Sequence, residues 1–149
     1  MDDMIMIGVD LAKSVFQLHG VDQLHGGDAE GRPQLRRQLR RSQMLGFFER
    51  QPPCLIGMEA CASAHYRARE PGRIGHDVRL MLPSYVKGYV KRGKTDKADA
   101  EAICEAVSRP SMRFVPIRSE ETRALLMTHK ARELLVRQQT QVVNAMRAH

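Results

Sequence analysis

Long hydrophobic runs are missing from this sequence. No apolar stretch in the chain approaches the roughly 20 residues that a membrane-spanning helix requires. The first four residues, Met-Asp-Asp-Met, are acidic where a secretory signal would be basic. These absences argue against a membrane or secreted protein and predict a cytoplasmic one.

Cysteine is also scarce. The three cysteines, Cys54, Cys61 and Cys104, are an odd number and form no Cys-x-x-Cys pair. We therefore predict buried, reduced thiols rather than a disulfide framework. Cys61 and His65 lie four residues apart, but no second ligand pair accompanies them, so a zinc site is disfavoured.

Negative charge is the scarcer sign. The chain has 24 Lys and Arg against 17 Asp and Glu, a net charge of +7, which predicts an anionic partner. Nucleic acid is favoured over a membrane surface because no basic amphipathic anchor stands out. Two basic segments are candidates for phosphate contacts, and the alternative for each is a solvated basic face. Their members are Lys87, Lys91, Arg92 and Lys94 in one, and Arg36, Arg37, Arg40 and Arg41 in the other.

The apolar runs and turn residues predict an α/β domain. Strands are expected at 4–10, 15–21, 34–41, 54–58 and 77–82, although helix is a rival at 34–41. Helices are expected at 42–48, 60–70, 84–90, 96–108 and from 119 onwards. Ser42 and Ser119 are the expected caps of two of these helices, and Pro71-Gly72 should cut or kink the helix before it. Residues 113–116 should form a short extended piece.

Four acidic residues occupy notable positions in this pattern. Asp10 and Glu59 each follow an apolar strand, where a sheet presents side chains to a site. Asp96 and Asp99 lie three residues apart in the first turn of a helix and would share one face. Neighbouring carboxylates repel each other, and a bound divalent cation would relieve that repulsion. The alternative for the helical pair is an acidic first turn stabilised by the helix dipole.

Three short motifs contain these acids. They are Ile7-Gly-Val-Asp10-Leu-Ala-Lys, Gly57-Met-Glu59-Ala and Lys94-Thr-Asp96-Lys-Ala-Asp99-Ala. In this order and at these separations, they resemble the motifs of the DEDD transposases of bacterial insertion sequences. The similarity runs the full length of the chain, through to the stretch at 132–137.

The resemblance implies a ribonuclease-H-like, RuvC-like fold, which is a mixed sheet flanked by helices. Residues 1–117 would form this domain, and 118–149 would be a long helix that begins a linker or coiled-coil segment. Family members continue into a second domain that supplies a serine nucleophile, and we expect that domain to be absent here. The apolar stripe of the final helix predicts a homo-oligomer.

The resemblance also implies a chemistry. Asp10, Glu59, Asp96 and Asp99 would be the catalytic tetrad and would hold two Mg²⁺ ions, with Mn²⁺ as a substitute. The activity would be DNA transposition and site-specific recombination through phosphodiester cleavage and joining. DNA would be the partner, and a structured guide RNA, which some members use, would be a second.

Two other functions compete with this one. A non-catalytic remnant would bind DNA or RNA through its basic segments without needing the acids. An actin-like or sugar-kinase-like nucleotide binder also opens with a Gly-x-Asp strand, but it should contain further glycine-rich phosphate loops. Tyr85 and Tyr89 are predicted to be packing residues, with base stacking as the alternative.

Overall fold

The computed structural model describes residues 5–22, 35–90 and 96–148. The chain divides into two compact units, Met1–Ile117 and Arg118–His149. Among the described residues, no helix combines the length and the hydropathy that crossing a membrane would require.

The first unit is built on a mixed sheet with the strand order β3-β2-β1-β4-β5-β6. The strands are β1 (Ile5–Leu11), β2 (Val15–Asp22), β3 (Leu35–Arg40), β4 (Leu55–Glu59), β5 (Asp77–Met81) and β6 (Phe114–Val115). β1, β2 and β3 form an antiparallel meander, whereas β4 and β5 run parallel to β1. The predicted extended piece at 113–116 contributes β6, which pairs antiparallel with β5.

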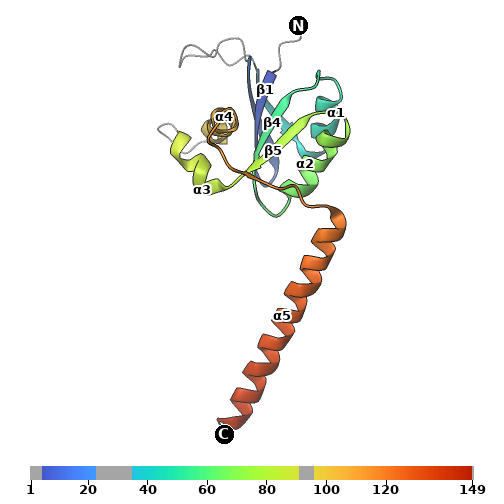
Figure 1. Ribbon diagram of the computed structural model, residues 1–149, viewed down its shortest axis with the longest axis vertical. Helices are drawn as coiled ribbons and strands as arrows, with labels where there is room; N and C mark the ends of the chain where they lie inside the picture. The colour runs from blue at the N-terminus through green and yellow to red at the C-terminus, as the bar shows by residue number, and fades with distance from the viewer. Residues whose placement is uncertain (1–4, 23–34, 91–95, 149) are drawn as a thin grey trace. The chain divides into compact units, whose positions relative to one another are not determined.

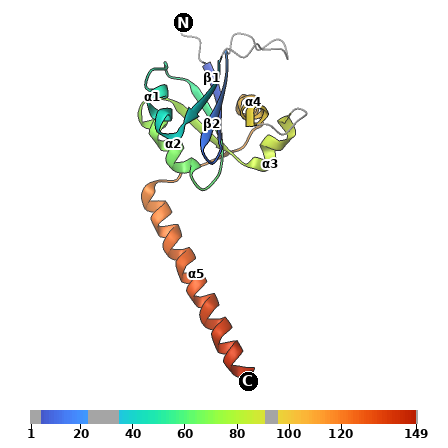
Figure 2. The same cartoon turned by 180° about the vertical axis from the view of Figure 1, so that it is seen from behind.

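Helices cover both faces of this sheet. They are η2 (Arg41–Gln43), α1 (Met44–Phe48), α2 (Ala64–Arg73), α3 (Pro83–Val86), η3 (Lys87–Tyr89) and α4 (Asp96–Val107). In both ribbon views, α1 and α2 lie on one side of the sheet, and α3 and α4 lie on the other (Figures 1 and 2). The second unit is a single helix, α5 (Glu120–Arg147), whose predicted cap is confirmed because Ser119 Oγ accepts a hydrogen bond from Thr122 N–H at 3.2 Å.

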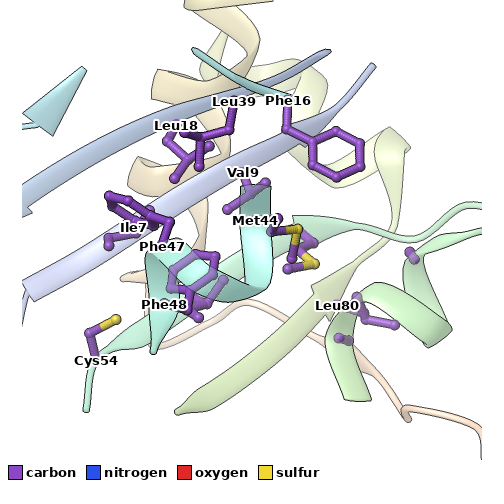
Figure 3. Close-up of a cluster of buried hydrophobic side chains, with 14 residues drawn as sticks. Ile7, Val9, Phe16, Leu18, Leu39, Met44, Phe47, Phe48, Cys54 and Leu80 are labelled. Carbon is purple, nitrogen blue, oxygen red and sulfur yellow. The ribbon is translucent and has the colours of Figure 1, made fainter. Parts of the chain in front are cut away.

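The alternation of side chains along the strands creates two hydrophobic layers. On the α1 and α2 side, Ile7, Val9, Phe16 and Leu18 pack with Phe48 in the larger cluster (Figure 3). The smaller hydrophobic layer lies on the α4 side, where it packs α4 against the sheet. Its buried members are Leu55, Met81, Val86, Ala102, Ile103, Ala106 and Val107.

Two glycines allow α4 to rest on the sheet backbone. A Cβ atom at Gly8 would overlap the carbonyl oxygen of Ala100 and would come within 2.5 Å of the Cys104 amide nitrogen. A Cβ atom at Gly57 would lie 2.8 Å from the Val107 Cβ atom. Because side chains of any size would push the helix outward, these glycines set the distance between α4 and strands β1 and β4.

A buried histidine ties together the ends of elements on the other side. His76 Nδ1 accepts a hydrogen bond from the Cys54 amide at 3.1 Å, so Nε2 carries the proton and donates to the Phe48 carbonyl at 2.9 Å. This bridge connects the end of α1 with the entrances to β4 and β5, and it satisfies two buried backbone groups.

The prediction for the helix at 60–70 was wrong at both ends. Helix α2 begins at Ala64 and continues through Pro71 to Arg73. A proline inside a helix removes one backbone hydrogen bond. Pro71 lies in the last turn of α2, so few helical hydrogen bonds follow it. Pro71 is buried, and the burial of its apolar ring offsets that loss.

The structure corrects some of the other local predictions and confirms others. Ser42 does not cap α1, because it lies inside η2, and Gln43 precedes the first residue of the helix. Cys54 and Cys104 are buried and free as expected, whereas Cys61 is exposed. The strand at β3 is confirmed over the rival helix, since Leu39 is buried and its neighbours in the strand are exposed.

We expect Gly8→Ala to destabilise the chain by about 3 kcal/mol, because the added methyl group would force α4 away from β1. Gly46→Ala in α1 is the matched control, since nothing lies within 4 Å of a Cβ atom there. Its effect should stay below about 1 kcal/mol. Urea denaturation measures both, and equal stability of the two variants would contradict the close contact.

Candidate metal and nucleic-acid site

Two acidic residues, Asp10 and Glu59, lie side by side near the carboxyl ends of two neighbouring parallel strands. In the parallel pair β1 and β4, Gly8 lies opposite Gly57 and Val9 lies opposite Met58. Asp10 and Glu59 are the next residues of their strands. Side chains alternate along a strand, so both acids project on the face of the two glycines, which is the face that α4 covers.

Helix α4 brings a third acid to this place. Burial raises the pKa of Glu59 above its ordinary value, the negative charge of Asp99 raises it further, and the positive charge of Lys87 partly lowers it. Asp99 and Lys87 therefore lie within electrostatic reach of Glu59. The side chain of Asp96 lies outside the described part of the chain, as do Lys91, Arg92 and Lys94.

The donor atoms of this site are carboxylate oxygens, which are the ligands that Mg²⁺ and Mn²⁺ prefer. The repulsion between Glu59 and Asp99 is the electrostatic condition that a bound cation would relieve. Among the described side chains, no three His, Cys, Asp or Glu residues are close enough to hold a metal ion together.

The arginines of the second basic segment divide between the two faces of the sheet. The Arg37 guanidinium lies 5.9 Å from the ring centre of Phe47, and that of Arg41 lies 6.0 Å from the ring centre of Phe16. Both aromatic rings belong to the core on the α1 and α2 side. Arg36 and Arg40 alternate with Arg37 along β3 and are exposed, so they project on the face of the acids.

Sequence reasoning missed the role of Gly8 and Gly57. The signal that could have revealed it is their spacing, because each glycine stands two residues before a strand-end acid. Residues two apart in a strand lie on the same face of the sheet. The glycine that makes room for α4 and the acid two residues later therefore face the same side. The motifs Gly8-Val-Asp10 and Gly57-Met-Glu59 therefore encode both the packing and the site.

Comparison with solved structures supports the fold. RuvC from Thermus thermophilus matches with a TM-score of 0.55 at 13% sequence identity, over 75% of this chain and all of that one. This similarity, together with the mixed sheet and its flanking helices, confirms the predicted ribonuclease-H-like, RuvC-like fold.

Comparison of sequences gives the relationship. A probable family 20 transposase of Pseudomonas aeruginosa is 54% identical over 141 residues, which cover 95% of this chain and 40% of the relative. The transposase for insertion sequence element IS1328 of Yersinia enterocolitica is 42% identical over 148 residues, covering 99% of the chain and 42% of the relative. The chain thus spans about two fifths of the length of these relatives. The family model of the IS110-type DEDD transposases matches residues 7–149, and the chain belongs to this transposase family.

Proposed function

We propose that this chain provides the carboxylate-bound, divalent-metal site at which an insertion-sequence transposase cleaves and joins DNA phosphodiesters. The observation that carries the proposal is the placement of Asp10 and Glu59 at one edge of adjacent parallel strands, with Asp99 raising the pKa of Glu59. The chain covers about two fifths of its relatives, so complete transposition is proposed for the longer protein.

Each acid has a separate structural support. Asp10 lies on β1, at the centre of the sheet, and Glu59 ends the neighbouring strand. Asp96 and Asp99 belong to the first turn of α4, which the glycine contacts hold against the sheet. These four residues would bind two Mg²⁺ ions, or Mn²⁺ in their place, and the ions would neutralise the phosphate and stabilise its attacking and leaving oxygens.

Basic side chains on the same face would bind the DNA backbone. Lys87 is exposed and close enough to Glu59 to lower its pKa. Arg36 and Arg40 extend the positive charge across β3, and Lys91, Arg92 and Lys94 precede α4 in the sequence. Phosphate contacts of this kind position a strand without reading its sequence.

A second function is favoured by the other two arginines. Arg37 and Arg41 lie towards the face opposite the acids, where a metal site would not need them. A structured guide RNA would be the ligand of this face. A chain that bound nucleic acid only in this way would be the non-catalytic DNA- or RNA-binding alternative.

Helix α5 is proposed to join copies of the chain. It is 28 residues long, and none of its residues is buried. Exposed apolar side chains, among them Leu134, Leu135 and Val142, recur along it. Pairing with a second copy would remove this apolar surface from water.

The first test is metal-dependent nicking of an element-end DNA by the purified chain. We expect nicking with Mg²⁺ or Mn²⁺, and a loss of about two orders of magnitude in Glu59→Gln, which removes one ligand charge. Glu49→Gln, at an exposed position outside the site, is the matched control. Salt-sensitive DNA binding without nicking, equal in all three proteins, would support the non-catalytic alternative instead.

The second test uses the repulsion at Glu59. Because the folded state raises the pKa of this carboxyl, stability is fully present below the ordinary glutamate value of 4.5 and falls as the pH rises through the folded pKa. Without metal at neutral pH, Glu59→Gln should therefore melt roughly 2–4 °C higher than the wild type. The difference should vanish in acid, and added Mg²⁺ should raise the melting temperature of the wild type more than that of the variant.

Calorimetric scans over pH, with and without Mg²⁺, measure this effect. Glu49→Gln should follow the wild type under every condition, since its side chain is exposed. A Glu59→Gln variant that melts below the metal-free wild type at neutral pH would contradict the repulsion.

The third test addresses α5. Leu134→Lys should shift the chain from dimer or higher oligomer towards monomer, with association weakened about tenfold or more, because a charge would be buried between helices. Gln139→Lys adds the same charge at an exposed polar position and is the control. Light scattering after size exclusion gives the masses, and a monomeric wild type at high concentration would refute the assembly.

A further inference from the structure

A cavity lies on the α4 side of the sheet, between α3–η3 and the segment that follows α4. Its volume is about 260 Å³, and it is lined by Tyr85, Tyr89, Ser111, Met112 and Arg113. Pockets for drug-sized ligands start at about 300 Å³. The cavity is therefore suited to a flat group the size of a single heteroaromatic base.

Two aromatic rings form one wall of this cavity. Tyr85 is 43% exposed, so it is not the packing residue that its helical spacing predicted. Tyr89 is half-buried and packs against the smaller hydrophobic layer, while Val86 between them is fully buried. The segment is thus anchored by Val86, and Tyr85 keeps a ring available for a ligand.

Positive charge and a flexible thioether complete the lining. Arg113 lines the cavity, and the Arg109 guanidinium lies 5.8 Å from the ring centre of Tyr89. Arg109 is held by an ion pair with Glu105 at 2.7 Å. No carboxylate is among the described lining residues, so none of them would repel an anionic ligand. Met112 can adapt its shape to a ring.

The tyrosines belong to the same short segment as a residue of the acid site. Lys87 lies between Tyr85 and Tyr89 in sequence, and its side chain is exposed. A nucleic-acid strand whose phosphate contacts Lys87 would therefore lie close to the segment that carries both tyrosines.

We propose that this cavity binds an unpaired nucleobase, stacked on Tyr85 with its adjoining phosphate on Arg113. The assignment rests on the proposed function, because it places the base on the strand that the acid site processes. Aromatic stacking and a guanidinium–phosphate contact are the two interactions that single-stranded nucleic acids offer in sequence-tolerant binding. DNA and RNA share this chemistry.

The test compares two oligomers of equal length and charge in the presence of EDTA. One is an oligothymidylate, and the other has the same sugar–phosphate backbone without bases. We expect the wild type to bind the first about tenfold more tightly, and Tyr85→Ala to lose that preference while its affinity for the abasic oligomer stays unchanged. Fluorescence anisotropy of labelled oligomers gives the affinities.

Tyr66→Ala is the matched control. Tyr66 is 44% exposed and also has arginine neighbours, since Arg67 and Arg69 lie within 6 Å of its ring centre, but it is on α2. It should keep the preference, and Tyr85→Phe, which retains the ring, should keep it too. An oligouridylate in parallel identifies whether RNA or DNA supplies the base, and a preference over the abasic backbone in either arm supports the site.

Equal binding of both oligomers by the wild type would overturn the assignment, as would an equal loss of preference in Tyr66→Ala. If the wild type binds both oligomers alike and nicks DNA in a Glu59-dependent manner, only the base site fails. If it binds neither oligomer, the nucleic-acid contacts of the proposed function fail with it.

Discussion

The contact between α4 and the backbone of β1 and β4 is the constraint on which the site depends. Gly8 lies against Ala100 and Cys104, and Gly57 lies against Val107, with no room for a Cβ atom at either glycine. The helix is held at this distance along its length, so its first turn reaches the strand ends. Asp99 thereby comes within electrostatic reach of Glu59. A larger residue at either glycine would weaken the fold, and it would also move Asp99 away from Glu59.

The same contact brings the candidate site to the central strands of the sheet, which are the strands that the larger hydrophobic cluster stabilises. β1 and β4 are the central strands, and their other face belongs to the larger hydrophobic cluster, which includes Ile7, Val9, Ile56 and Met58. The core on that face stabilises strands whose opposite face carries partly buried acids. Burial of like charges costs stability, and functional sites are where such a cost is commonly retained. The division of the helices between the two faces thus places the larger hydrophobic cluster on one face and the side chains of Asp10 and Glu59 on the other.

Much of the fold could be predicted because its central strands are buried on both faces. Such strands appear as continuous apolar runs, so the strands predicted at 4–10 and 54–58 agree within one residue with β1 and β4. The helix at 60–70 was misplaced because its end depends on the burial of Pro71, which local propensity does not contain. The exposure of Cys61 and Tyr85 was missed for the same reason, since neighbours distant in sequence decide what covers a side chain.

The sequence by itself determined the order of the elements, the acids at the strand ends and the resemblance to the transposase family, because these depend on local pattern and on short motifs. Only the tertiary structure decided that the arginines of β3 divide between two faces, since a strand alternates its side chains about a sheet whose covering helices come from elsewhere in the chain. It also decided that Tyr85 and Arg113 line one cavity. These two residues are far apart in the sequence. Contacts between such residues arise from strand order and helix packing, and no local sequence pattern specifies them.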